Sequence, residues 1–186
     1  MSNYKLIKYI KILCVVFVFI LCSCSAKTGD SVRISEENYE VFIDENFQYG
    51  FSIYSDDNSV LYQEKNIKQP VYLSKNNSLI TISVDYGTGL QGVRFFDLNK
   101  KIMSKEFWYV ISNNDDLVAY IDGDDLDKRM LIIRNIFDEN KFSYHANIDF
   151  ARIDTPVKNA KFLSNNSLEI EYLNSDNENS EKIVYF

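Results

Sequence analysis

The stretch YLSKNNSLITISV, Tyr72–Val84, carries the pattern of a β-hairpin. Asn76 and Asn77 interrupt it, and asparagine tolerates the left-handed backbone conformation that tight hairpin turns require. After the turn, apolar and polar side chains alternate with the period of a half-buried strand. The apolar positions of this strand are Ile80, Ile82 and Val84.

The same plan recurs in VISNNDDLVAYID (Val110–Asp122) and in FLSNNSLEIEYLN (Phe162–Asn174). In each copy an apolar residue pair leads into serine, an asparagine-rich turn and an alternating strand. An earlier hairpin, FQYGFSIYSDDNSVLYQ (Phe47–Gln63), is expected to turn at residues 56–58 and to supply a divergent fourth unit.

A further strand is expected after each hairpin, in GVRFFDLNKKI (92–102), RMLIIRNIFDENKF (129–142) and EKIVYF (181–186). The turns at Asn76 and Asn113 are 37 residues apart, close to the period of four-stranded propeller blades. These units resemble the blades of bacterial β-propeller proteins, although they lack the Trp-Asp and kelch signatures. We therefore predict an all-β antiparallel meander with propeller-like units, arranged as an open, partial or small propeller or, alternatively, as a β-sandwich.

The composition supports strands, because the chain has 13 Tyr, 13 Phe and only two Pro. Its formal charge is −7, and residues 1–23 contain three lysines and no acidic residue, so their removal would leave −10. A surface of this charge argues against nucleic acid as a partner and against electrostatic docking on anionic lipid.

The first 23 residues have the layout of a secretory signal. Three lysines lie between positions 5 and 11, and an apolar run follows from Ile12 to Leu21. Ten helical residues span about 15 Å, which is half the thickness of a hydrocarbon core. Such a segment is removed on maturation.

The end of this run, Leu21-Cys22-Ser23-Cys24, resembles the lipobox of bacterial lipoproteins, apart from Cys22 in a slot where another small residue is more usual. The resemblance implies cleavage between Ser23 and Cys24 and a diacylglyceryl thioether on Cys24. An uncleaved anchor helix and an ordinary secretory signal are the alternatives.

We therefore expect the chain to comprise a signal peptide (1–23), a flexible tether (24–38) and a single β domain (39–186). Cys14 and Cys22 would leave with the leader, so the mature domain would have no free thiol, disulfide or thiolate metal site. If the cell is Gram-negative, Ser25 after the lipidated cysteine implies, by resemblance, the periplasmic face of the outer membrane.

Two motifs suggest ligand sites. GTGLQG (87–92) matches the dinucleotide fingerprint, but a β-pattern follows where that motif requires a helix, so we expect a glycine-rich hairpin loop. DGDDLD (122–127) clusters carboxylates, but its glycine is too early for a calcium loop; a solvated acidic turn is favoured over weak cation binding. We expect no metal and no cofactor.

His145 is the only histidine, so it cannot form a multi-histidine zinc site. A Ser-His-Asp triad remains open, although the chain has no nucleophile elbow motif. The aromatic segments EFWYV (106–110) and NYEVF (38–42) suit stacking on sugars or anchoring a protein partner, and burial in a β core is the simpler expectation.

We therefore expect a lipid-anchored lipoprotein of the cell envelope without enzymatic activity or catalytic residues. Its favoured role is binding a protein, as an envelope component or as a periplasmic inhibitor or immunity protein. A lipoprotein that binds sugar or peptide is the alternative, motivated by the tyrosines. A hydrolase, which would depend on His145, is the third hypothesis.

Overall fold

The computed structural model describes residues 33–186, except residues 88, 124–128 and 154. This part of the chain consists of β-strands, turns and loops and contains no helix. The predicted all-β antiparallel fold is confirmed. The strands are, in chain order, β1 (Arg33–Ser35), β2 (Tyr39–Ile43), β3 (Tyr49–Tyr54), β4 (Val60–Ile67), β5 (Val71–Asn76), β6 (Leu79–Asp85), β7 (Gln91–Asp97), β8 (Ile102–Met103), β9 (Phe107–Trp108), β10 (Val110–Asn113), β11 (Leu117–Asp122), β12 (Met130–Asn135), β13 (Ser143–Asn147), β14 (Val157–Ser164), β15 (Ser167–Leu173) and β16 (Asn179–Tyr185).

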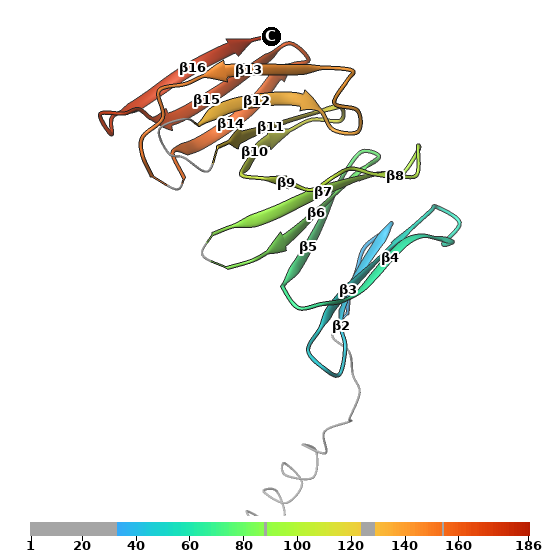
Figure 1. The fold of residues 1–186 in the computed structure, drawn as a ribbon. Coiled ribbons are helices and arrows are strands. Elements are labelled where there is room, and N and C mark those ends of the chain that lie inside the picture. The colour runs from blue at the N-terminus through green and yellow to red at the C-terminus, as the bar shows by residue number, and fades with distance from the viewer. Residues whose placement is uncertain (1–32, 88, 124–128, 154) are drawn as a thin grey trace, which may run out of the picture.

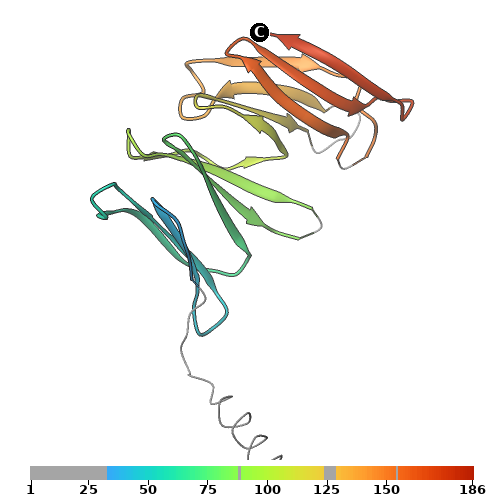
Figure 2. The same ribbon diagram turned by 180° about the vertical axis from the view of Figure 1, so that it is seen from behind.

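Four antiparallel sheets follow one another along the chain. The first contains β1–β4, the second β5–β8, the third β10–β13 and the fourth β14–β16, each in sequence order, and β9 pairs with β7 of the second sheet. The sheets are stacked in chain order, with the first and the fourth at opposite ends (Figures 1 and 2). Among the described strands, none of the first sheet pairs with one of the fourth, so they form no closed ring.

The predicted hairpins are present, and their turns use the expected chemistry. Asn77 has a φ of 51° between β5 and β6, and Asn58 has a φ of 61° between β3 and β4. In the turn between β10 and β11, the side-chain oxygen of Asn114 accepts hydrogen bonds from the backbone N–H groups of Asp116 and Leu117, at 3.0 and 2.7 Å. These three turns are therefore stabilised by local side-chain and backbone geometry.

Clusters of buried side chains join each sheet to the next. Strand β6 shows the pattern, because Ile80 and Ile82 pack against the first sheet whereas Leu79, on the opposite face, packs with Phe95 toward the third sheet. A further cluster, which includes Leu131 and residues of β15, lies between the third and fourth sheets. The two middle sheets thus bury apolar side chains on both faces.

The first sheet includes residues that precede the predicted domain boundary at Tyr39. Residues 33–35 form β1, which pairs with β2, and the Asn38 side chain is buried and donates to the Tyr54 carbonyl at 3.2 Å and to Asp56 Oδ1 at 3.1 Å. The prediction of a flexible tether was therefore wrong for this segment, which long-range hydrogen bonds hold in the first sheet. Residues 1–32, including Ser23 and Cys24, lie outside the described residues.

Asp97, the last residue of β7, carries a buried carboxylate at the turn that follows the strand. Asp97 Oδ1 accepts hydrogen bonds from the N–H groups of Asn99 and Lys100, and Oδ2 lies 2.8 Å from Lys100 Nζ. Burial alone would raise the pKa of Asp97, but the hydrogen bonds and the charge of Lys100 outweigh it and hold the pKa below its usual value. The stabilisation is therefore fully present above the unfolded-state pKa and is lost as the pH falls through the folded-state pKa.

We expect Asp97→Asn to lower the free energy of unfolding by about 1–2 kcal/mol at pH 7, because it removes a charge-assisted contact. The difference from wild type should shrink below about pH 4, where the wild-type carboxylate begins to protonate. Urea unfolding across this pH range measures both effects. Glu45→Gln, at an exposed turn carboxylate, is the control. A destabilisation by Asp97→Asn that stays constant with pH would contradict this assignment.

Candidate functional site

Three half-exposed aromatic side chains mark the candidate site, at the junction between the second and third sheets. Tyr86, Trp108 and Tyr109 are 44%, 36% and 41% exposed. Their neighbour Phe107 is buried, so the prediction that EFWYV packs in the core is confirmed for Phe107 and wrong for Trp108 and Tyr109. In the other aromatic segment, NYEVF (38–42), Val41 is buried, whereas the rings of Tyr39 and Phe42 are only partly buried.

The backbone explains why these rings face outward. Phe107 and Trp108 pair with β7, and the next strand, β10, pairs with β11 of the third sheet. Tyr109 is the single residue between them and has a φ of 51°, a left-handed conformation that costs a non-glycine residue about 1–3 kcal/mol. Its carbonyl accepts a hydrogen bond from Ile121 N–H at 3.2 Å, which holds the crossing in place. Such strain is concentrated at functional sites.

Two cavities adjoin Tyr109, and Ile121 lines both of them. The first has a volume of about 260 Å³ and lies where the second, third and fourth sheets meet. The second has a volume of about 470 Å³ and lies along β9 and the end of β11. We call the two cavities and the three exposed rings the aromatic groove. Its polar lining comprises Gln91, Lys105, Glu106, Asp122, Thr155, Lys158 and Asn159.

Polar contacts position the rings. Tyr86 and Trp108 have ring centroids 5.1 Å apart and tilted by 46°, and the Tyr86 hydroxyl donates to Glu106 Oε1 at 3.4 Å. Burial and the nearby Glu106 charge raise the pKa of Tyr86, so its hydroxyl stays protonated and can donate. The Arg129 guanidinium lies 5.8 Å from the Tyr109 ring centroid. This arrangement suits binding, with aromatic faces beside charged groups.

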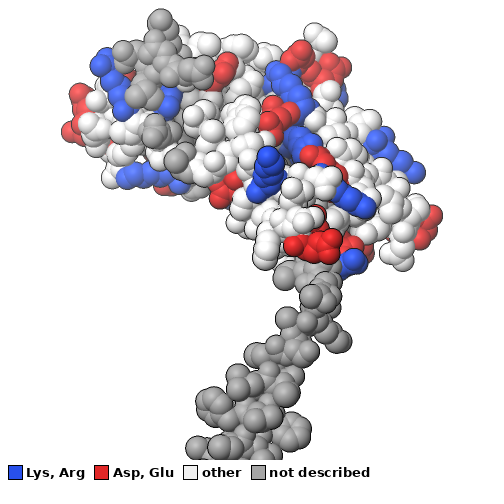
Figure 3. Space-filling view, turned by 60° about the horizontal axis from the view of Figure 1, so that its bottom comes forward, with Lys and Arg blue, Asp and Glu red and all other residues white. Residues whose placement is uncertain are grey.

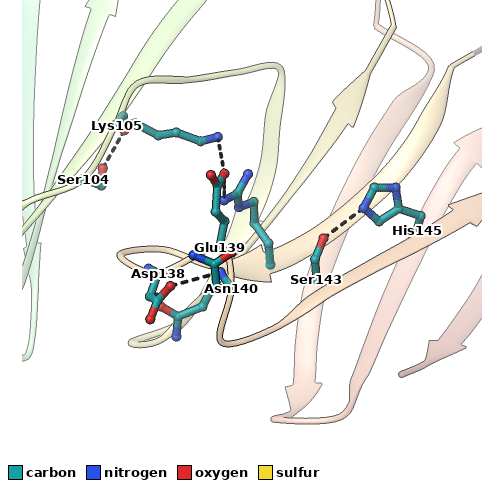
Figure 4. A network of polar contacts seen from close by, with 9 residues as sticks. Ser104, Lys105, Asp138, Glu139, Asn140, Ser143 and His145 are labelled. Atoms are coloured by element: carbon teal, nitrogen blue, oxygen red, sulfur yellow. Dashed lines mark hydrogen bonds and ion pairs between the residues drawn. The ribbon is translucent and has the colours of Figure 1, made fainter.

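The predicted site residue His145 lies elsewhere, on β13. Its Nε2 is 2.9 Å from Ser143 Oγ, and both residues are exposed (Figure 4). Within the described part of the chain, no carboxylate hydrogen bonds to this histidine, so the structure brings together a serine and a histidine without the acid of a triad.

A charge network beside this pair connects the second and third sheets (Figure 4). Lys105 Nζ lies 3.2 Å from Glu139 Oε2, and the Arg134 guanidinium, on β12, pairs with the same oxygen. The hydrogen bond from Lys105 and the charge of Arg134 lower the pKa of Glu139. Both cations also lie within about 6 Å of the Phe107 ring centroid, so the network reinforces the junction that presents the groove.

The segment GTGLQG lies in the loop between β6 and β7 and at the start of β7, as predicted for a hairpin. It contributes Gly89, Leu90 and Gln91 to the cavities. Of the acidic turn 122–127, residues 124–127 lie outside the described residues. The described residues contain no group of three or more His, Cys, Asp or Glu side chains placed to hold a metal ion.

Charges on the face that includes the first sheet are mixed. Figure 3 shows acidic and basic side chains interspersed among uncharged ones on this face, with no continuous basic surface of the kind that binds nucleic acid.

Sequence reasoning identified the segment that carries Trp108 and Tyr109 but not the groove. Gln91 lies in the second sheet, Lys158 in the fourth, and Tyr109 at the crossing between the second and third. Only the stacking of the sheets brings these residues together.

The sequence matches no protein-family model, and no curated protein matches it significantly. No helix in the described part of the chain is long and apolar enough to cross a membrane.

Proposed function

We propose that the protein is a lipid-anchored lipoprotein of the cell envelope that binds another protein through the aromatic groove and catalyses no reaction. The observation that carries the binding proposal is the strained crossing at Tyr109, which holds two neighbouring aromatic rings at the surface beside two cavities. The anchor would be the lipidated Cys24, after cleavage behind Ser23; the lipobox-like sequence is its support.

The chemistry of the groove favours a protein partner. Tryptophan, tyrosine and arginine are the residues that most often dominate binding energy at protein interfaces. Here Trp108, Tyr109 and Arg129 occur together, and the cavities beside Tyr109 offer space for side chains of the partner. The polar lining would form a hydrated rim around this apolar centre.

We further propose that the four sheets form an open, partial propeller-like arrangement. Its support is the consecutive order of the meanders and the burial of apolar side chains between successive sheets. Binding through the junctions of such a stack fits an envelope-assembly component or an inhibitor or immunity protein. A neighbouring toxin gene would favour the second role.

Affinity capture from detergent-solubilised envelopes tests the function. Trp108→Ala should reduce recovery of the specific partner at least tenfold, because truncation of a hot-spot aromatic typically costs 2 kcal/mol or more, about thirtyfold in Kd. Tyr72→Ala, at an exposed tyrosine on β5 outside the groove, should leave recovery unchanged. Failure to recover a specific protein, or equal recovery with Trp108→Ala, would contradict the proposal.

A sugar or a peptide is the second candidate ligand, favoured by the Tyr86–Trp108 ring pair beside the Glu106 carboxylate. A thermal-shift screen separates the two. A small ligand at 100 times its Kd should add about 2.7 kcal/mol of stability, and Trp108→Ala should abolish the shift. A screen in which no sugar or peptide stabilises the protein would count against this alternative.

A further inference from the structure

The edge of β16 offers unpaired backbone groups. The fourth sheet has three strands, whereas each of the others contains at least four. Strand β16 pairs with β15 over seven residue pairs without a register shift, and the described residues place no strand on its other side. It contains neither proline nor a bulge, two features that commonly block edge strands.

Hydrogen bonds show which backbone groups of β16 are unpaired. The Phe186 N–H donates to the backbone carbonyl of Asn166 at 3.1 Å, and the Asn174 N–H donates to the backbone carbonyl of Glu178 at 3.0 Å. Along a strand, the backbone N–H and C=O groups of successive residues point to opposite sides. The backbone groups of the even-numbered residues of β16 therefore point toward β15. The N–H and C=O groups of Glu181, Ile183 and Tyr185 therefore point away from the sheet.

The side chains of these residues lie on the outer face of the fourth sheet. Val184 is buried in the core, so its neighbours Ile183 and Tyr185 project to the opposite face. Ile183 is 41% exposed and Tyr185 is 70% exposed. A regular edge with unpaired backbone groups and exposed apolar side chains is a template for another strand.

We propose that the β16 edge pairs with β16 of a second copy of this chain, antiparallel across a twofold axis centred on Ile183. Three pairs of outward-facing residues then exchange backbone hydrogen bonds: Ile183 with Ile183, and Glu181 with Tyr185 twice. The two fourth sheets become one continuous six-stranded sheet, and this contact is independent of the aromatic groove.

Charge disfavours two other registers. A twofold axis centred on Glu181 or on Lys182 would place like charges directly opposite each other, which is destabilising in a cross-strand pair. Centring on Ile183 instead places Ile183 against its own copy, Lys182 against Val184 and Glu181 against Tyr185. The apolar contact at the axis adds to the backbone ladder, and the Glu181 carboxylate can accept a hydrogen bond from the Tyr185 hydroxyl.

Sedimentation equilibrium of the purified full-length protein in detergent tests the proposal. The wild type should dimerise, and Ile183→Lys should raise the dimer Kd at least about tenfold, because it places two ammonium groups at the twofold axis. Ile102→Lys is the matched control, since Ile102 is also 41% exposed but lies on β8. Thermal unfolding of both variants confirms that they fold.

A charge-swap mixture makes the test specific for the register. Ile183→Glu alone should also be monomeric, and an equimolar mixture of Ile183→Glu with Ile183→Lys should recover dimers, because opposite charges then meet at the axis. A monomeric wild type would overturn the proposal and leave the edge to a strand of a different protein. The proposal would also be overturned if Ile102→Lys raised the dimer Kd as much as Ile183→Lys does, or if Ile183→Lys left the dimer Kd unchanged.

Discussion

Phe95→Ala is expected to lower the free energy of unfolding by about 3–5 kcal/mol, the range for removing a phenyl ring from a packed core. Phe95 is fully buried, and its ring lies 6.0 Å from that of Phe107, between the second and third sheets. A loss of this size is a large fraction of the about 5–15 kcal/mol that stabilises an ordinary domain.

Urea unfolding at neutral pH measures the effect, with Phe47→Ala as the control. Phe47 is 85% exposed and undergoes the same chemical change, so its replacement should alter the unfolding free energy by less than about 0.5 kcal/mol. Because Phe107 precedes the groove residues, Phe95→Ala should also weaken partner capture. Comparable stability losses for the two variants would contradict the proposed stacking of these sheets.

Cys24→Ala is expected to abolish both lipid attachment and membrane association. Burial of acyl chains contributes about 0.8 kcal/mol per CH₂, so loss of the only proposed lipid site removes the whole anchor. Feeding cells labelled palmitate, followed by fractionation and mass spectrometry of the mature amino terminus, measures both losses. Cys22→Ala should remain labelled and in the membrane fraction. A labelled Cys24→Ala protein, or a wild-type chain that keeps Met1, would contradict the lipoprotein proposal.

The hairpins could be predicted because their signals are local. Asn77 and Asn114 are turn residues whose own conformation or side chain closes the turn, and the strands beside them alternate clearly. β1 has no such pattern, because all three of its residues are exposed, and it is a strand only through its pairing with β2. β8 and β9 contain two residues each, too few for any periodicity.

The site was less predictable than the fold. The composition of the aromatic segment EFWYV predicts burial in the core, and Phe107 is indeed buried. Tyr109 is exposed, because it lies at the crossing between two sheets. The position of such a crossing depends on strand pairing between segments that are distant in the sequence. Asn38 shows the reverse case, since a residue at the end of an expected tether is buried by contacts with residues 54 and 56.

Photo-crosslinking from position 109 in living cells tests the central claim, that the groove around Tyr109 receives a protein. A photoreactive phenylalanine analogue in place of Tyr109 should form one discrete adduct with a single envelope protein, and Trp108→Ala should eliminate it. The same analogue at Tyr72 should give no such adduct. An adduct equally strong from position 72, or none from position 109, would contradict the account.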